Sequence, residues 1–178
     1  MNTLQILPAT LEDLAALQAI GRKTFAETFA DSNSAENLAA YLEEGFSEDK
    51  LGAELRNENS RFYFALQKEE VIGYLKVNFG DAQSEKQDPN ALEIERIYVL
   101  QQYHGKQVGA LLYEQALAIA KERKAPFIWL GVWEENPRAI RFYQKLGFVE
   151  FGEHIFQLGD DAQRDVLMKL ELRGVQNP

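Results

Sequence analysis

The 178-residue chain contains no cysteine, and this absence removes several chemistries at once. Disulfide bonds, thiolate metal sites and a covalent intermediate on a cysteine are all excluded. Histidine is scarce as well: His104 and His154 lie far apart, without a His-x-x-x-His or carboxylate-rich ligand spacing. We therefore predict that the protein holds no metal.

Long apolar runs are also missing. No segment approaches the roughly 20 apolar residues that a membrane-spanning helix needs, and the first residues lack a basic region followed by an apolar signal segment. We therefore expect a cytoplasmic protein with no membrane partner.

Basic residues are outnumbered, with 19 Lys and Arg against 28 Asp and Glu, which gives a formal net charge of −9. This balance disfavours a nucleic-acid partner, because affinity for phosphate backbones depends on clustered Lys and Arg. An acidic surface would favour a cationic substrate, although it also serves solubility.

What remains is the composition of an ordinary globular protein, with 46% hydrophobic residues and enough length for one core. We predict a single domain over residues 1–173 and a frayed tail over residues 174–178. Apolar runs predict strands at residues 4–7, 61–67, 71–79, 149–157 and 164–172. Helices should follow the capping residues Thr10, Ser34 and Ser47, and the polar residues 80–90 should form an exposed loop.

Residues 92–110, LEIERIYVLQQYHGKQVGA, are the most informative stretch, because a strand runs into a glycine-containing turn that opens a helix. Free backbone N–H groups in the first turn of a helix bind an anion without a basic side chain. Gly105 and Gly109 would let the main chain approach a phosphate closely. The spacing matches neither a P-loop nor a dinucleotide G-x-G-x-x-G motif, which disfavours ATP and NAD folds.

A second stretch, residues 129–148, reads WLGVWEENPRAIRFYQKLGF. It predicts a strand, a helix that starts at Asn136-Pro137 and carries Phe142-Tyr143, and then Gly-Phe. An amphipathic helix separates the two stretches. Its apolar stripe consists of Val108, Leu111, Leu112, Ala116, Ile119 and Ala120.

Together the two stretches resemble the GCN5-related N-acetyltransferase (GNAT) family. The resemblance implies an α/β (α+β) fold with a mixed, mostly antiparallel central sheet and helices on both faces, the acyl-CoA N-acyltransferase fold. It also implies an acetyl-CoA-dependent N-acetyltransferase that acts by direct attack in a ternary complex. Two positions depart from the family pattern aligned on Gly109: His104 replaces Gln or Arg, and Gln107 replaces the first motif glycine.

The resemblance also assigns roles to residues. Tyr143 would act as the general acid toward the departing thiolate, since a phenol can donate a proton while neutral at pH 7. Asn136 would either cap its helix or contact the coenzyme arm, and His104 and Lys106 would either contact phosphate or lie in solvent. The implied acetyl-CoA-binding residues are Ile97, Tyr98, Val99, His104, Gly105, Lys106, Gln107, Val108, Gly109, Ala110, Asn136 and Tyr143.

A base is needed for the amine. Glu93 and Glu95 would lie on one face of a regular strand. The resemblance favours Glu95 as the base, directly or through water, while Glu93 stays open. A surface position for Glu95, or an ion pair with Arg96 or Lys76, is the alternative.

The acceptor is predicted from residues 24–47, which resemble bacterial spermidine/spermine N-acetyltransferases. Acidic residues in this segment would suit a polycation: Glu27, Asp31, Glu36, Glu43 and Glu44. A polyamine is therefore the leading acceptor. A protein N-terminus, a lysine or another small amine, or a coenzyme-binding sensor without turnover, are alternatives, and the sequence allows a homodimer without requiring one.

Overall fold

The structure is a computed structural model that describes residues 3–172 of the chain. The predicted tail, residues 174–178, lies outside the described residues. The strands are β1 Leu4–Ala9, β2 Ser60–Gln67, β3 Glu70–Asn78, β4 Leu92–Val99, β5 Phe127–Trp133, β6 Val149–Leu158 and β7 Asp161–Glu171. The α-helices are α1 Leu14–Phe29, α2 Ala35–Gly45, α3 Glu48–Arg56, α4 Val108–Glu122 and α5 Pro137–Lys145.

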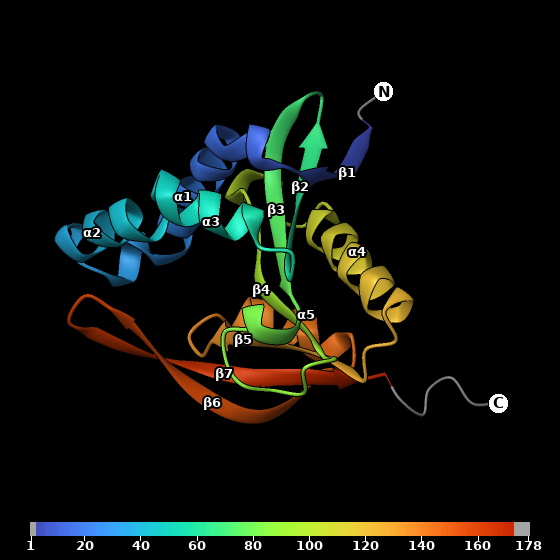
Figure 1. The fold of residues 1–178 in the computed structure, drawn as a ribbon. Helices are drawn as coiled ribbons and strands as arrows, with labels where there is room; N and C mark the ends of the chain where they lie inside the picture. The colour runs from blue at the N-terminus through green and yellow to red at the C-terminus, as the bar shows by residue number, and fades with distance from the viewer. Residues whose placement is uncertain (1–2, 173–178) are drawn as a thin grey trace.

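The seven strands form one sheet in the order β1-β2-β3-β4-β5-β7-β6. Neighbouring strands are antiparallel except β4 and β5, which are parallel and are connected through α4. Helices α1 to α3 lie on one side of the β2–β4 part of the sheet and α4 lies on the other (Figure 1). The predicted fold class is therefore confirmed.

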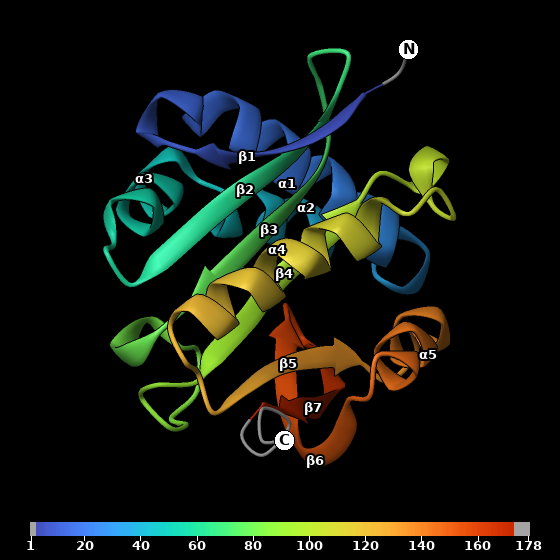
Figure 2. The ribbon, with the colours of Figure 1, turned by 90° about the vertical axis from the view of Figure 1, so that its right-hand side faces the viewer.

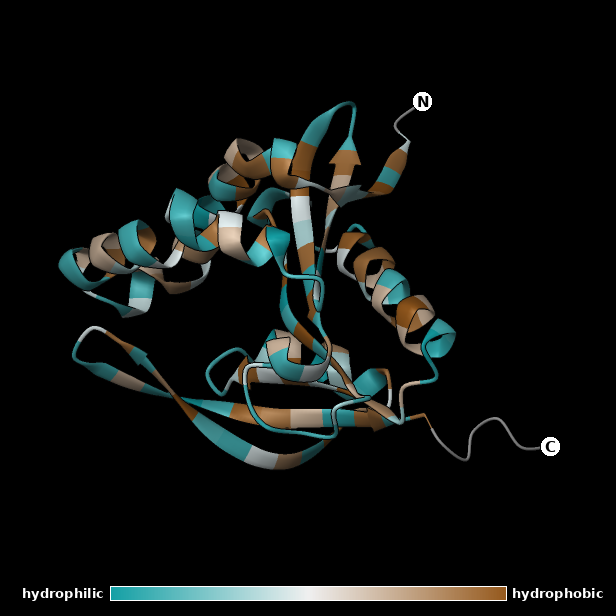
Figure 3. Ribbon diagram, in the orientation of Figure 1, coloured by the Kyte–Doolittle hydropathy of each residue, from teal (hydrophilic) through white to brown (hydrophobic). Residues whose placement is uncertain are grey.

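Local chemistry explains where the helices begin. The side chains of Ser34 and Ser47 accept hydrogen bonds from the backbone N–H groups of Asn37 and Lys50, so both act as the predicted caps. Helix α4 shows alternating apolar and polar bands (Figure 3). Its apolar residues Val108, Leu112, Ala116 and Ile119 are buried against the sheet.

Strands β4 and β5 pair only at their beginnings, through Leu92–Ile128 and Glu93–Trp129. Beyond these pairs the two strands separate, and α5 lies beyond the separated end (Figure 2). Among residues 3–172, the edge of β4 that faces away from β3 is therefore without a strand partner over residues 95–99. This opening in the middle of the sheet positions the candidate site.

Two sequence expectations need correction. Strand β4 is not regular, because Lys76 pairs with Arg96 while Val77 pairs with Ile94, which leaves Glu95 as the extra residue of a β-bulge. Residues 80–90 are not simply an exposed loop. They begin with a 3-10 turn at Gly80–Ala82, and the half-buried Gln83 side chain accepts a hydrogen bond from Trp129 Nε1 at 2.7 Å.

Within residues 3–172, no helix is long and apolar enough to cross a membrane. The same residues contain no group of three or more histidine or acidic side chains arranged to hold a metal ion.

Candidate active site

Two cavities meet where β4 and β5 separate. The larger cavity has a volume of about 630 Å³ and the smaller cavity a volume of about 430 Å³. Six residues line both cavities: Thr28, Ile97, Tyr98, Asn136, Ala139 and Tyr143. A molecule that extends from one cavity into the other would therefore pass Tyr143.

The smaller cavity contains the turn before α4. Of the residues predicted to bind acetyl-CoA, eleven line it: Ile97, Tyr98, Val99, His104, Gly105, Gln107, Val108, Gly109, Ala110, Asn136 and Tyr143. Lys106 does not line it, and its Nζ lies over the ring of Tyr103, 5.5 Å from the ring centre. The structure thus brings together residues 97–110 and 136–143, which are separate in the sequence, although Lys106 is not part of the lining.

The turn has the geometry of an open cradle. Gly105 has a φ of 79°, and a side chain carbon added at Gly105 or Gly109 would meet no protein atom within 4 Å. The first i to i+4 bond of the helix runs from Leu111 N–H to the Gln107 carbonyl, so the N–H groups before it are left for a ligand. These positions fit phosphate oxygens bound through the main chain.

Gln107 stands where the family pattern has its first glycine, and its backbone conformation is unusual for glutamine. Its φ of 68° is left-handed, a conformation that glycine adopts without steric cost. A glycine at this position would therefore suit the turn better, and glutamine keeps the turn at the cost of local strain.

The His104 side chain contacts two elements, one through each ring nitrogen. One ring nitrogen, Nε2, lies 2.9 Å from the Val99 carbonyl oxygen, and the other, Nδ1, lies 2.8 Å from Arg138 Nη1. Since the guanidinium can only donate, Nδ1 must accept, and Nε2 then carries the proton that is donated to Val99. His104 therefore ties β4 to α5 and orients Arg138, while its side chain is exposed at the edge of the smaller cavity.

Helix α5 supplies cations that the sequence analysis missed. Arg138, Arg141 and Lys145 line the smaller cavity, which has no acidic residue in its lining. Their spacing of three and four residues places them on one helical face, and this pattern could have been found in the sequence. The smaller cavity is thus suited to a polyanion.

Asn136 and Tyr143 lie at the junction of the cavities. The Asn136 side chain accepts a hydrogen bond from the N–H of Ala139 at 3.2 Å, so it caps α5. Tyr143 is 5% exposed and packs edge-on against Phe142 and Phe148. Burial raises the pKa of the Tyr143 phenol, which keeps it neutral and able to donate.

The larger cavity has the opposite charge. Six carboxylates line it, against three basic side chains, Lys50, Lys76 and Arg96, together with His154. The six are Glu54, Asp81, Glu85, Glu93, Glu95 and Asp165.

The acidic residues that the sequence suggested in residues 24–47 line neither cavity. That segment contributes aromatic rings to the larger cavity instead, from Phe25, Phe29, Tyr41 and Phe46. The carboxylates available to a polycation in the larger cavity therefore come from other segments of the chain.

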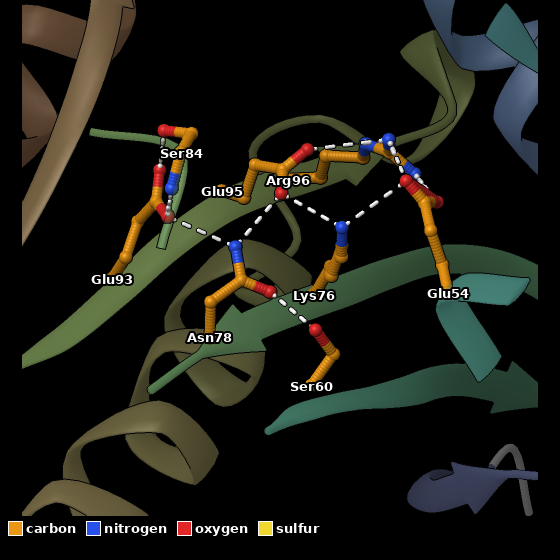
Figure 4. A network of polar contacts seen from close by, with 8 residues as sticks. All are labelled: Glu54, Ser60, Lys76, Asn78, Ser84, Glu93, Glu95 and Arg96. Carbon is orange, nitrogen blue, oxygen red and sulfur yellow. Dashed lines mark hydrogen bonds and ion pairs between the residues drawn. The ribbon is translucent and has the colours of Figure 1, made fainter. Parts of the chain in front are cut away.

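Glu95 lines the larger cavity. It belongs to a network of ion pairs (Figure 4). Its carboxylate is 2.7 Å from Lys76 Nζ and 3.2 Å from Arg96 Nη2, and Glu54 binds the same two cations. Burial alone would raise the pKa of Glu95, but Arg96 and Lys76 outweigh it and lower the pKa to about 2. The ion-pair alternative for Glu95 is therefore what the structure contains.

Glu93 has neutral partners only. Its Oε1 accepts from Asn78 Nδ2 at 2.9 Å and from the Ser84 N–H at 2.8 Å, and its Oε2 accepts from the Ser84 hydroxyl. Asn78 also donates to Glu95 at 2.8 Å, so one amide joins both carboxylates despite the bulge (Figure 4). Burial raises the pKa of Glu93 more than these hydrogen bonds lower it.

Residues 22–148 match the acetyltransferase (GNAT) family. An uncharacterized N-acetyltransferase in the pepI 3′ region of Lactobacillus delbrueckii subsp. lactis is 45% identical over 172 residues, which cover 97% of this chain and 99% of the relative.

Two further similarities involve Thermoplasma acidophilum. Its spermidine N(1)-acetyltransferase is 27% identical over 150 residues, 82% of this chain and 88% of the relative. The crystal structure of its PaiA N-acetyltransferase in complex with coenzyme A superimposes with a TM-score of 0.78 at 24% identity, covering 95% of this chain and 99% of that chain. The latter likeness supports the fold.

Proposed function

The chain belongs to the GNAT family and is an acyl-CoA-dependent N-acetyltransferase, and on this premise we propose that it acetylates a primary amine, with a polyamine as the leading acceptor. The observation that carries the proposal is the division of charge on the two sides of Tyr143. The smaller cavity is lined by cations and free backbone N–H groups, whereas among the charged residues that line the larger cavity carboxylates outnumber Lys and Arg by six to three.

Acetyl-CoA fits the smaller cavity. The turn over residues 104–110 would hold the pyrophosphate on main-chain N–H groups, and Arg138, Arg141 and Lys145 would add positive charge around it. The unpaired edge of β4 would bind the pantetheine arm as an added strand. When bound, acetyl-CoA supplies an activated thioester, and the chain's own contribution is to fix its direction toward Tyr143.

Tyr143 would stabilise the departing thiolate. Its phenol is neutral and lies at the junction of the two cavities, within the lining of both. A raised pKa makes the phenol a reluctant acid, so its main contribution would be a hydrogen bond that strengthens as charge develops on sulfur. Proton delivery would follow when the thiolate has formed.

The sequence left two candidates for the base, Glu93 and Glu95. Glu95 remains our sequence prediction, but a carboxylate held by two cations with a pKa of about 2 is a weak proton acceptor. Glu93 is held by neutral donors and has a raised pKa, which brings it closer to the range useful for a base. The electrostatics therefore favour Glu93 as the base, while Glu95 is held in its ion pairs with Lys76 and Arg96.

A polyamine is the leading acceptor for two reasons. Carboxylates outnumber Lys and Arg in the larger cavity by six to three, and those without an ion pair among the described residues, such as Asp81 and Asp165, would pair with ammonium groups. The similarity to a spermidine N(1)-acetyltransferase points in the same direction. A protein N-terminus, a lysine or another small amine remains the second candidate, since the fold itself does not determine the acceptor.

The experiment is thiol release from acetyl-CoA by the purified protein with spermidine, spermine, short diamines and basic peptides as separate acceptors. Release with polyamines at saturating acetyl-CoA supports the proposal. Release with peptides alone would keep the transferase and replace the acceptor. Binding of acetyl-CoA without release for any amine would favour a sensor, and Tyr143→Phe serves as the low-turnover control.

A further inference from the structure

Glu93 is 3% exposed, and its two carboxylate oxygens have different partners. Oε1 receives two donors that cannot reverse, the Asn78 amide and the Ser84 N–H. Oε2 receives one donor, the Ser84 hydroxyl. A proton that arrives on Glu93 would therefore settle on Oε2, because neither of the donors at Oε1 can turn into an acceptor.

The Ser84 hydroxyl is suited to both states of Glu93. It donates to Oε2 while the carboxylate is ionised, and after rotation it can accept from Oε2–H while the carboxyl is neutral. An N–H group in the same place would repel the protonated form. The Ser84 hydroxyl can therefore keep its hydrogen bond to Glu93 Oε2 both before and after this oxygen gains a proton.

Ser84 also connects Glu93 to solvent. Both residues line the larger cavity, but Ser84 is exposed whereas Glu93 is buried, and the Ser84 hydroxyl is bonded to Glu93 Oε2. Its place is fixed by its neighbour Gln83, whose amide donates to the carbonyls of Gly80 and Asp88 and accepts from Trp129. The loop thus presents one hydroxyl to Glu93 at a defined position.

We propose that Ser84 is a positioning residue, which holds Glu93 to accept a proton from the acceptor amine and passes that proton to solvent. The inference rests on the proposed function. An ammonium that becomes an acetamide loses two protons: the thiolate takes one as the carbon–sulfur bond breaks and the carbon–nitrogen bond forms, and the second is released. Glu93 Oε2 would receive this second proton, and the Ser84 hydroxyl would relay it outward.

The groups around Glu93 agree with this role. Glu95, on the same strand, is the charged neighbour that adds to the raised pKa, and Lys76 on β3 faces Glu95. On β5 the paired residue is the uncharged Trp129, and the loop places Asp81 and Glu85 in the same cavity. The protonation of Glu93 is therefore set mainly by burial and by its neutral donors.

The test compares Ser84→Ala with Ser84→Thr in the full chain, using spermidine as the acceptor. Ser84→Ala keeps the N–H and removes the hydroxyl that lowers the pKa of Glu93, so the acidic limb of kcat/KM should move up by about one pH unit, roughly a tenfold loss at a fixed pH on that limb. Ser84→Thr should restore the profile. Titration of the amine is common to all variants and cancels.

Two further variants distinguish the positioning of Glu93 by Ser84 from a general effect of the loop and from Glu95 acting as the base. Lys86→Ala changes an exposed residue of the same loop that lines neither cavity, and its profile should match the parent's. Lys76→Met changes a partner of Glu95, so a shift with Lys76→Met but none with Ser84→Ala would make Glu95 the proton acceptor and overturn the proposal.

Carbon-13 NMR titration of the Glu93 carboxyl gives a readout that does not need turnover. The pKa of Glu93 is expected to be higher in Ser84→Ala than in the parent. Equal pKa values would contradict the proposal that Ser84 positions Glu93. If the parent acetylates no amine, the proposed function and the proton relay fail together, while the titration still decides whether Ser84 positions Glu93.

Discussion

Glu93 and Glu95 are two residues apart, yet the structure predicts opposite effects of neutralising them. Glu95→Gln removes the charge that pairs with Lys76 and Arg96, and Glu93→Gln removes a charge that has no ionic partner. Glutamine fits the second site well, because its oxygen can accept from Asn78 and the Ser84 N–H while its amide donates to the Ser84 hydroxyl.

The magnitude for Glu95 follows from linkage between protonation and folding. The pKa of Glu95 falls from its ordinary value of 4.5 to about 2, and each pKa unit corresponds to about 1.4 kcal/mol, so the charge stabilises the fold by about 3 kcal/mol at pH 7. Because the folded pKa is the lower one, this stability is complete above about pH 4.5 and is lost as the pH falls toward 2. For Glu93 the folded pKa is raised, so the effect on stability is opposite: the free energy of unfolding falls as the pH rises and Glu93 becomes ionised.

Urea unfolding of both variants at pH 7 and pH 3 provides the assay. Glu95→Gln should lower the free energy of unfolding by about 3 kcal/mol at pH 7 and by about 1 kcal/mol at pH 3, whereas Glu93→Gln should equal or exceed the parent at pH 7. A loss below about 1 kcal/mol for Glu95→Gln at pH 7, a loss that does not change with pH, or a larger loss for Glu93→Gln would refute the reasoning. In thiol release, Glu93→Gln should lose more turnover than Glu95→Gln.

Other substitutions test the remaining parts of the site. Tyr143→Phe should lower kcat roughly 100-fold with little change in acetyl-CoA affinity, as measured by thiol release and calorimetry, and a loss of affinity alone would leave only packing for this residue. Arg141→Gln should weaken acetyl-CoA binding and reduce its dependence on salt, and an unchanged salt dependence would place the phosphates elsewhere. Gln107→Gly should relieve a left-handed residue and raise the melting temperature by roughly 1–4 °C, and a lower melting temperature would contradict the strain.

The sequence by itself determined the parts of the molecule that depend on neighbouring residues. Apolar periodicity and capping side chains predicted the strands and helices, because both are properties of a short segment. The turn before α4 was predicted for the same reason, whereas Asn136 and Tyr143 were proposed as site residues through the resemblance of their motif to the GNAT family.

Only the tertiary structure decided the chemistry of the carboxylates. Glu95 is held by Lys76 from β3 and by Arg96, and Glu54, which binds the same two cations, comes from α3, about 40 residues before Glu95. The β-bulge that turns Arg96 toward Glu95 depends on pairing between β3 and β4, and the hydroxyl on Glu93 comes from a loop that appeared to be mere surface. Charge, burial and hydrogen bonds act across space, so the pKa of a side chain is set by whatever the fold packs against it, and no pattern along the chain records that.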